Sequence, residues 1–301
     1  MADTPPVTSR RQRPSPEQAR RRRAFAIGAI VLCVALGAAA VAVALPHVHK
    51  TKPAAPLPPP PPKPFRVVFP EGFTRAQMAD RVHAVAKIAE RKRHAAVALA
   101  SHPYLRASRT AVLPCFTPRR QSNLEGFLFP ATYDFLAKTT SRQLVADQLD
   151  AFCQNWNSVN FDYARSKNLT PYDVLKIASM VEKETLAPSE RPLVAAVIYN
   201  RLHARMPLGI DATLRYGLHI SPTQSILESQ LQSDNPYNSR RVPGLPPTPI
   251  ANPGLASIRA AAHPAKVDYL YFVRKPDKVH HFFTASDTAF AQYECAHGYG
   301  C

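Results

Sequence analysis

The 301-residue sequence lacks the motifs that several functional classes require. It has no glycine-rich phosphate loop and no basic motif interleaved with aromatic residues, so nothing supports a nucleotide or nucleic-acid ligand. It also has no Cys-x-x-Cys pair, and no pair of histidines lies close to a cysteine, as the usual zinc sites require. We therefore expect no metal ion.

Charged residues are absent from one long stretch near the N-terminus. Ala24 to Leu45 gives 22 uncharged residues, enough to cross a hydrocarbon core of about 30 Å. A cleaved signal peptide would have a shorter apolar region of roughly 7–15 residues. The preceding segment, residues 1–23, carries seven arginines and two acids. The positive-inside rule predicts a cytoplasmic tail, one uncleaved transmembrane helix at 24–45, and an extracytoplasmic remainder at the cell membrane.

The net charge of +17 divides unevenly between these parts. The tail accounts for +5, which leaves +12 on the residues expected outside the membrane. A basic exported domain suits an anionic polymer of the cell surface. Nucleic acid would suit it equally on charge alone, but the outward-facing anchor argues against that partner.

Cysteine usage agrees with export. Cys33 lies in the expected anchor, and an even set of four remains: Cys115, Cys153, Cys295 and Cys301. Such a set favours disulfides in an oxidising compartment. Three pairings are possible, and the short loop between Cys295 and Cys301 favours Cys295–Cys301 together with Cys115–Cys153.

The exported part begins with a proline-rich linker. Residues 46–64 include nine prolines, five of them consecutive, which is typical of a semi-rigid spacer. Folded sequence begins with a short strand at Arg66–Phe69. Thr74 and Gln77 then predict a capping box, with a helix after it and a further helix to about His102. A small subdomain is expected at 65–115.

A larger domain is expected at 120–301. Its predicted elements are a helix around 140–155, a helix after Thr170, a helix from Ser189 to Arg205, a stiff proline-rich loop at 242–254, a helix at 255–262, and strands at 267–274 and 280–284. Helices interleaved with short strands indicate an α+β fold.

One acid lies within an apolar face of the helix that follows Thr170. At about 100° per residue, Glu182 projects between Ala178 and Leu175. A carboxyl group in an apolar wall has its charged form disfavoured and can hold a proton, as a general acid must. The alternative is an acid at the helix edge that reaches solvent or pairs with an arginine.

Glu184 does not qualify as a second acid for the same bond. Residues two apart on a helix point about 160° away from each other, so Glu182 and Glu184 cannot flank one glycosidic bond. We expect Glu184 to be structural, with an arginine as a possible partner.

Six sequence blocks occur in one order. They are Glu125-Gly-Phe-Leu-Phe-Pro-Ala-Thr-Tyr133, Ile177-Ala-Ser-Met-Val-Glu-Lys-Glu-Thr185, Val197-Ile-Tyr-Asn-Arg-Leu202, Gly244-Leu-Pro-Pro-Thr-Pro-Ile-Ala-Asn-Pro-Gly254, Ala260-Ala-Ala-His-Pro-Ala265 and Tyr269-Leu-Tyr-Phe-Val273. Together they resemble the endolytic murein transglycosylase family, also called YceG-like. The resemblance spans about residues 120–290, and the order of all six blocks makes it specific.

This resemblance implies a membrane-anchored lytic transglycosylase. Such an enzyme cleaves the bond between N-acetylmuramic acid and N-acetylglucosamine inside peptidoglycan strands and leaves 1,6-anhydro-muramoyl ends. Glu182, the first acid of the Val-Glu-Lys-Glu-Thr motif, would act as general acid and then as base. The resemblance further implies a LysM-like subdomain at 65–115, no cofactor, and peptidoglycan synthases as partners. A non-catalytic peptidoglycan-binding scaffold is the alternative.

The resemblance also suggests residues that bind the glycan strand. Asp211 matches an Asp of the family, where it would bind sugar or cap a turn, and Tyr237-Asn238 matches a Tyr-Asn pair before the proline-rich loop. The remaining candidates are Asn252 as an amide ligand for an acetamido group, Glu125 in the cleft or holding its own turn, and His280 with His281 on a strand that lines the cleft.

Overall fold

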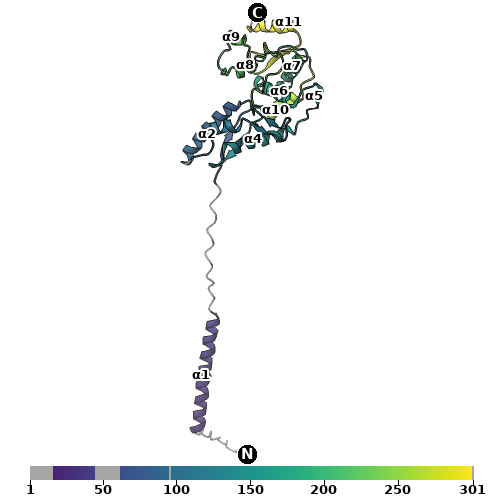
Figure 1. Cartoon of the computed structure of the whole chain (residues 1–301). Coiled ribbons are helices and arrows are strands. Elements are labelled where there is room, and N and C mark those ends of the chain that lie inside the picture. The colour runs from purple at the N-terminus through teal and green to yellow at the C-terminus, as the bar shows by residue number, and fades with distance from the viewer. Residues whose placement is uncertain (1–15, 45–61, 95, 300–301) are drawn as a thin grey trace, which may run out of the picture. The chain divides into compact units, whose positions relative to one another are not determined.

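The computed structural model describes residues 16–44, 62–94 and 96–299 (Figure 1). The chain divides into two units, Met1–Pro60 and Pro61–Cys301. In the first unit, the described residues form one helix, α1 (Pro16–Ala44). Within the described part of the chain, no helix combines the length and the apolar character needed to cross a membrane. The proline-rich linker lies mainly outside the described residues.

The second unit is α+β, as the sequence predicts. Its strands form three separate antiparallel pairs: β1 (Phe65–Val68) with β4 (Thr132–Phe135), β2 (Ala111–Val112) with β3 (Arg120–Gln121), and β5 (Tyr271–Arg274) with β6 (His281–Thr284). Because β1 pairs with β4, the N-terminal segment shares a sheet with the segment that follows residue 120. The boundary between a LysM-like subdomain and a larger domain stays a prediction.

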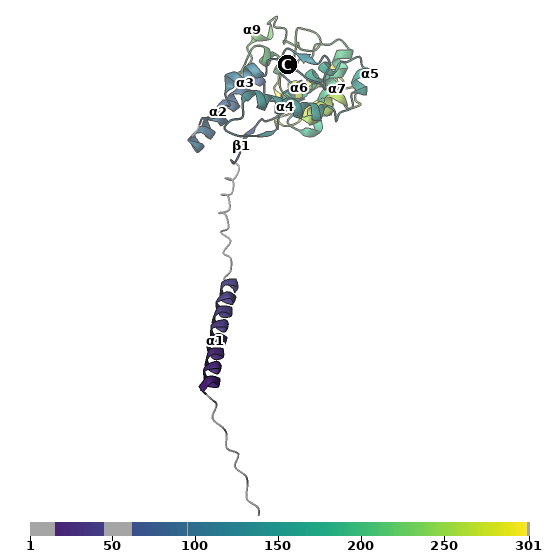
Figure 2. The same cartoon turned by 60° about the horizontal axis from the view of Figure 1, so that its bottom comes forward.

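Helices are the predominant regular structure of this unit (Figure 2). They are α2 (Arg75–Arg93), α3 (Ser101–Ala107), α4 (Ser141–Trp156), α5 (Asp162–Ser166), α6 (Pro171–Glu184), the 3₁₀ helix η1 (Pro188–Glu190), α7 (Arg191–His203), α8 (Asp211–Gly217), α9 (Glu228–Leu231), α10 (Leu255–Ala262) and α11 (Asp287–His297). Helix α6 packs against both α7 and α10, which places it at the centre of the unit.

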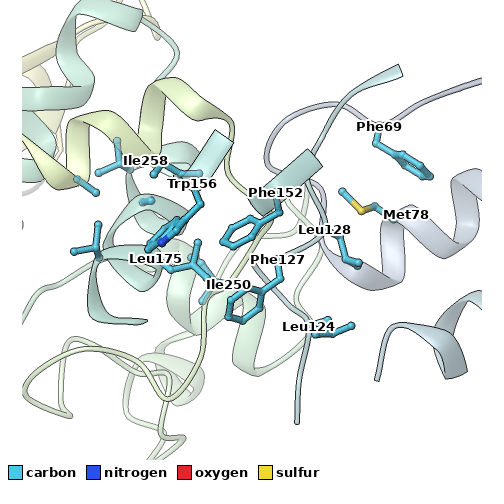
Figure 3. Packing of buried hydrophobic residues seen from close by; sticks show 14 of the residues in the cluster. Phe69, Met78, Leu124, Phe127, Leu128, Phe152, Trp156, Leu175, Ile250 and Ile258 are labelled. Atoms are coloured by element: carbon cyan, nitrogen blue, oxygen red, sulfur yellow. The ribbon is translucent and has the colours of Figure 1, made fainter. Parts of the chain in front are cut away.

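One hydrophobic core joins the strands and helices (Figure 3). It is rich in aromatic side chains, which bury large apolar areas and pack edge-on or offset. Phe127 lies 5.1 Å from Phe152 between ring centroids, and Trp156 lies 4.3 Å from Phe161. Residues from both sides of position 120 belong to this core, including Phe69, Met78, Leu124, Phe152, Leu175 and Ile258.

Local sequence signals place several elements correctly. Thr74 and Thr170 each cap a helix through a complete capping box, with Gln77 and Asp173 as their partners. The expected helix to His102 is wrong, because α2 ends at Arg93 and α3 begins only at Ser101.

A disulfide joins Cys115 to Cys153 and so ties the segment before β3 to α4. The second expected pair includes Cys301, which lies outside the described residues.

Candidate active site

A cavity of about 1150 Å³ opens at the C-terminal end of α6. Its wall combines the first turn of α2, the end of α6, the segment from Leu208 through α8, and the β5–β6 hairpin. The acidic side chains in this wall are Glu125, Glu184, Asp211 and Glu294. The basic side chains are Arg75, Lys183, Arg201, Arg215, Arg240 and Arg274. Glu184, and not Glu182, is among the described residues that form this wall.

Glu182 is held on the other side of α6. Its side chain is 7% exposed, which agrees with the expected apolar position. The backbone N–H of Gly254 donates to Oε2 at 3.0 Å, and Nη2 of Arg191 lies 3.7 Å from Oε1. These contacts tie α6 to α7 and α10. Glu182 is thus paired in a helix interface, and its expected catalytic role stays a prediction.

A second carboxylate joins this interface. Oε2 of Glu71 lies 3.9 Å from Nη2 of Arg191. Burial raises the pKa of Glu71, the charge of Glu182 raises it further, and Arg191 lowers it. A Cβ atom at Gly254 would overlap the Glu71 carboxylate. We call Glu71, Glu182, Arg191 and Gly254 the carboxylate clamp; it joins the turn before α2 to the helical centre.

Glu184 is the last residue of α6 and faces the cavity. Two residues turn a helix by about 200°, so the side chain that follows Glu182 by two positions points to the opposite side. Burial raises the pKa of Glu184 to about 7. The charge of Asp211 also raises this pKa, while Arg274, the backbone N–H of Ala212 and Lys183 lower it. Glu184 can therefore hold a proton near neutral pH and donate it.

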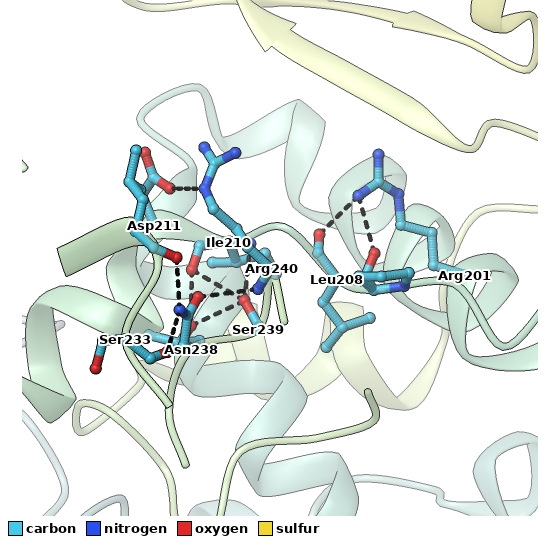
Figure 4. A network of polar contacts seen from close by, with 11 residues as sticks. Arg201, Leu208, Ile210, Asp211, Ser233, Asn238, Ser239 and Arg240 are labelled. Atoms are coloured by element: carbon cyan, nitrogen blue, oxygen red, sulfur yellow. Dashed lines mark hydrogen bonds and ion pairs between the residues drawn. The ribbon is translucent and has the colours of Figure 1, made fainter. Parts of the chain in front are cut away.

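A polar network fixes Asp211 beside the cavity (Figure 4). Oδ1 of Asp211 accepts from Nε of Arg240 at 2.7 Å. The neighbouring Ser239 hydroxyl accepts the backbone N–H of Ile210 at 2.9 Å and contacts the Thr213 hydroxyl at 2.9 Å. The segment that contains Arg240 is thus attached to the start of α8, so that a carboxylate and a guanidinium both line the cavity.

Arg201 supports the same wall from α7. Its Nη1 donates to the carbonyl oxygens of Pro207 and Leu208 at 3.2 and 2.8 Å (Figure 4). Its Nε donates to the carbonyl oxygen of Leu270 at 2.6 Å. These bonds attach the segment before α8 and the segment before β5 to one helix. The guanidinium therefore helps to set the width of the cavity.

Asn238 and Asn252 are structural. Asn238 is fully buried, and its Nδ2 donates to the carbonyl oxygens of Leu231 and Ser233. Asn252 is also fully buried: its Oδ1 accepts from Gly126 and Leu128, and its Nδ2 donates to Phe73 and Glu125. Both amides are used within the protein, so the expectation that Asn252 binds an acetamido group is corrected.

Glu125 occupies the other end of the cavity wall and is only 3% exposed. Its carboxylate accepts from the backbone N–H of Arg75 at 2.9 Å, from Nδ2 of Asn252 at 2.9 Å and from the Tyr216 hydroxyl at 3.2 Å. Burial raises the pKa of Glu125 to about 7, against the lowering effect of these donors. It joins the start of α2, the proline-rich loop and α8.

Two other predicted residues lie away from the cavity wall. The Tyr237 hydroxyl contacts the Thr248 hydroxyl at 2.8 Å, where the ring supports the proline-rich loop. His280 is exposed, and its Nδ1 lies 2.9 Å from Oδ2 of Asp277 in the hairpin turn. Its neighbour His281 lines the cavity. Of the residues predicted to line the cleft, Asp211, Glu125 and His281 therefore share the cavity.

Sequence reasoning missed Glu184, Arg274 and Arg240 as cavity residues. The spacing within α6 shows that Glu182 and Glu184 face opposite ways, but the partners of each come from distant segments. Strand alternation in the hairpin is a signal for Arg274, which lies opposite His281 in the β5–β6 register. Among the described residues, no group of three or more His, Cys, Asp or Glu side chains is placed to hold a metal ion.

Comparison with known proteins gives the same family as the six sequence blocks. A curated relative from Bacillus subtilis, named endolytic murein transglycosylase, is 40% identical over 157 residues, which cover 50% of this chain and 42% of the relative. One from Streptococcus pneumoniae with the same name is 34% identical over 227 residues, covering 69% of this chain and 40% of the relative. The chain thus spans about two-fifths of the length of these relatives.

A solved structure resembles the fold. The crystal structure of a YceG-like protein from Listeria monocytogenes superimposes with a TM-score of 0.65 at 28% identity, and the match covers 77% of this chain and 76% of that one. The family model described as YceG-like matches residues 47–294. The match includes both the cavity and the carboxylate clamp, and the chain belongs to the YceG-like family.

Proposed function

We propose that this chain is an endolytic murein transglycosylase that cuts peptidoglycan strands internally and leaves 1,6-anhydro-muramoyl ends. Membership of the YceG-like family and the names of its curated relatives support this activity. The observation that carries the proposal is a carboxyl group in the cavity, Glu184, whose pKa of about 7 lets it donate a proton near neutral pH.

Glu184 is the proton donor in this mechanism. It protonates the oxygen that links muramoyl C1 to C4 of the next N-acetylglucosamine, and the C1–O4 bond breaks as that oxygen leaves as a hydroxyl group. The muramoyl 6-hydroxyl attacks C1, a C1–O6 bond closes the anhydro ring, and the hydroxyl proton passes to a basic group in the cavity. The substrate supplies the nucleophile, so one acid and one base complete the reaction.

This proposal takes Glu184, the second acid of the motif, as the donor, and Glu182, the acid that the family resemblance implies, stays the alternative. Both side chains are removed from bulk water, but Glu182 faces an arginine and a backbone N–H, whereas Glu184 faces the cavity. An acid that must give its proton to a bound sugar has to reach that sugar. The contacts of Glu182 in the carboxylate clamp favour a structural role for it.

The basic side chains of the cavity suit an anionic glycan. Lys183 and Arg274 line it and are exposed. Muramoyl residues carry a lactyl group, and their stem peptides carry carboxylates. Exposed cations beside the reacting bond would attract these groups.

We further propose that the uncharged segment Ala24–Leu45 anchors the chain in the cell membrane, with residues 61–301 outside and beside peptidoglycan synthases. The arginine-rich segment before it and the Cys115–Cys153 disulfide support this topology. Protease added to intact protoplasts should then degrade residues 61–301. Protection of these residues would contradict the topology.

Mass spectrometry of the products tests the activity. Purified full-length protein in detergent should convert glycan strands into shorter strands that end in 1,6-anhydro-muramoyl groups. Reducing ends in place of the anhydro ends would mean that water attacks C1. The protein would then be a hydrolase. If the strands bind the protein but stay uncut, the protein would be a non-catalytic scaffold and not an enzyme.

A further inference from the structure

A second cavity, of about 560 Å³, opens between α5, α7 and the segment that precedes β5. Three tyrosines line it: Tyr163 of α5, Tyr199 of α7 and Tyr269. The rings of Tyr163 and Tyr199 lie 5.7 Å apart between centroids. The mechanism above uses none of these residues, and we call this space the tyrosine cavity.

The tyrosine cavity is held open by bonds within the protein. Nδ2 of Asn200 donates to the carbonyl oxygens of Val267 and Tyr269, each at 2.9 Å. These bonds attach the segment before β5 to α7, so the site is formed before any ligand binds, as ligand pockets usually are. Three of the six sequence blocks contribute to its lining, those at 197–202, 260–265 and 269–273.

Polar atoms of three uncharged side chains in this lining are open to a ligand. Oδ1 of Asn200 and the hydroxyl groups of Tyr163 and Tyr269 form no hydrogen bond within the described residues. Every buried side-chain nitrogen or oxygen of those residues has a partner, so these three atoms are in contact with solvent. The Tyr199 hydroxyl is used, because it donates to the carbonyl oxygen of Ala261 at 2.8 Å.

The tyrosine cavity differs from the first cavity in charge. Among the described residues that line it, the charged side chains are Lys266 and Asp268, which have opposite signs and are exposed. In the wall of the first cavity, basic side chains outnumber acidic ones. Aromatic faces, a few polar atoms and no net charge suit an uncharged ligand that has both apolar and polar surface.

A row of aromatic rings connects the two cavities. Tyr269 stacks on Phe283 at 5.9 Å, and Phe283 stacks on Phe272 at 6.0 Å, between ring centroids. Phe272 lines the first cavity, and all three rings are partly exposed. Helix α7 gives Asn200 to one cavity and Arg201 to the other. The chain advances at most about 11 Å from residue 269 to residue 272, so a ligand of a few sugar units can reach from one cavity to the other.

We propose that the tyrosine cavity is a distal binding site for the glycan strand, which takes an uncharged N-acetylhexosamine unit while the bond to be cut lies in the first cavity. The proposal rests on the function proposed above and does not depend on which glutamate of α6 donates the proton. Sugar rings carry C–H groups on their faces, which pack against the negative faces of tyrosine rings. Their hydroxyl and acetamido groups bond to Oδ1 of Asn200 and to the open tyrosine hydroxyls.

A distal site makes the enzyme select long strands. A strand that fills both cavities makes the second contact as an intramolecular event, so it binds more tightly than a strand that fills only the first cavity. The contact is the same in the bound substrate and in the transition state, so it lowers KM and leaves kcat unchanged. The strand then extends beyond the cut bond, as an internal cut requires.

Binding of a tetramer of N-acetylglucosamine tests the site without any cleavage. This probe is uncharged and has no lactyl group or stem peptide. In calorimetry with the full-length protein in detergent, Tyr163→Ala should weaken its binding about 10-fold. Tyr299→Ala is the matched control, because Tyr299 is exposed and is not among the described residues of either lining. No binding by the wild type, or equal affinity of the two variants, would overturn the proposal.

Tyr163→Leu guards against a folding defect at this partly buried ring. Leucine keeps an apolar side chain against Tyr199 but has no aromatic face. The variant should unfold at the urea concentration of the wild type and still bind the tetramer about 10-fold more weakly. Wild-type affinity in a folded Tyr163→Leu protein would contradict the proposal.

Cleavage of glycan strands of increasing length links the site to the reaction. In Tyr163→Leu, the KM of long strands should rise about 10-fold while kcat stays within about twofold. The KM of strands too short to fill both cavities should not change. A KM that rises equally at every length, or at none, would overturn the distal site.

The two assays separate this inference from the activity on which it rests. If the wild type cuts no strands but binds the tetramer through Tyr163, the proposed function fails and the binding site stands. If the wild type cuts strands and the Tyr163 variants bind and cut them equally well, only the distal site fails.

Discussion

Two glutamates near the C-terminus of α6 lie on opposite sides of the helix and have different surroundings. On one side, Glu182 lies against Arg191 and the N–H of Gly254 within the carboxylate clamp. On the other, Glu184 lines an open cavity and has a pKa of about 7. The residue type and the helix are the same, so the difference comes from tertiary neighbours. Burial against polar partners suits a carboxylate to a structural role, and burial beside a cavity suits it to donate a proton.

Removing the cation of the clamp should give the largest loss of stability. Arg191→Met leaves Glu182 almost buried without its ion pair and also removes the bond from Nε to the Ser257 hydroxyl. We expect a loss of about 3 kcal/mol in the free energy of unfolding, measured by urea denaturation. Arg274→Met is the control, because this exposed side chain makes no ion pair within the described residues. Equal stability of the two variants would contradict the structural role of the clamp.

The acids of the cavity wall should make the stability of the protein depend on pH. The pKa values of Glu125 and Glu184 are both raised to about 7, so the folded state keeps protons that the unfolded state releases above pH 4.5. The stabilising contribution is complete below the unfolded pKa and is lost as the pH rises through 7. The free energy of unfolding should therefore fall between pH 5 and pH 8.

One variant isolates the contribution of Glu184. In Glu184→Gln, the free energy of unfolding should fall over this pH range by roughly 1 kcal/mol less than in the wild type, or by a larger margin. Denaturation curves of the two proteins measure the difference. A difference that does not change with pH would show that Glu184 titrates alike in the folded and unfolded states.

Two neighbours of Glu184 should move the activity profile in opposite directions. A proton donor is lost as the pH rises through its pKa, so kcat/KM should decline above about pH 7. Arg274 lowers the pKa of Glu184 and Asp211 raises it. The decline should therefore move to higher pH in Arg274→Met and to lower pH in Asp211→Asn, by about one unit or less, equivalent to about 1.4 kcal/mol. Shifts in the same direction would exclude Glu184 as the titrating acid.

The sequence predicts local features of the fold well. The capping boxes at Thr74 and Thr170 need only residues within one turn, and the helices around 140–155 and 255–262 follow from their apolar spacing. The gap between α2 and α3 is harder to predict, because the helix propensity of residues 94 and 96–100 is overridden by the fold around them.

The candidate site depends on contacts that the sequence cannot display. Helix spacing shows that Glu182 and Glu184 face apart, but only the docking of α7 and α10 decides which one meets Arg191. The sequence suggests Asn252 as an amide ligand for a sugar, yet its amide bonds to the segments near residues 73 and 125. The same limit leaves His280 and His281 equivalent in the sequence, whereas the structure has His281 in the cavity wall.

Cleavage of glycan strands by Glu184→Gln and Glu182→Gln, side by side, tests the central claim most directly. Both substitutions keep the size of the side chain and remove its charge. The account predicts that Glu184→Gln lowers the rate of anhydro-muramoyl release by about 10²–10⁴-fold and remains folded. It predicts that Glu182→Gln unfolds at a lower urea concentration but cleaves within about threefold of the wild-type rate while folded. Full activity of Glu184→Gln, with loss of activity in a folded Glu182→Gln protein, would contradict it.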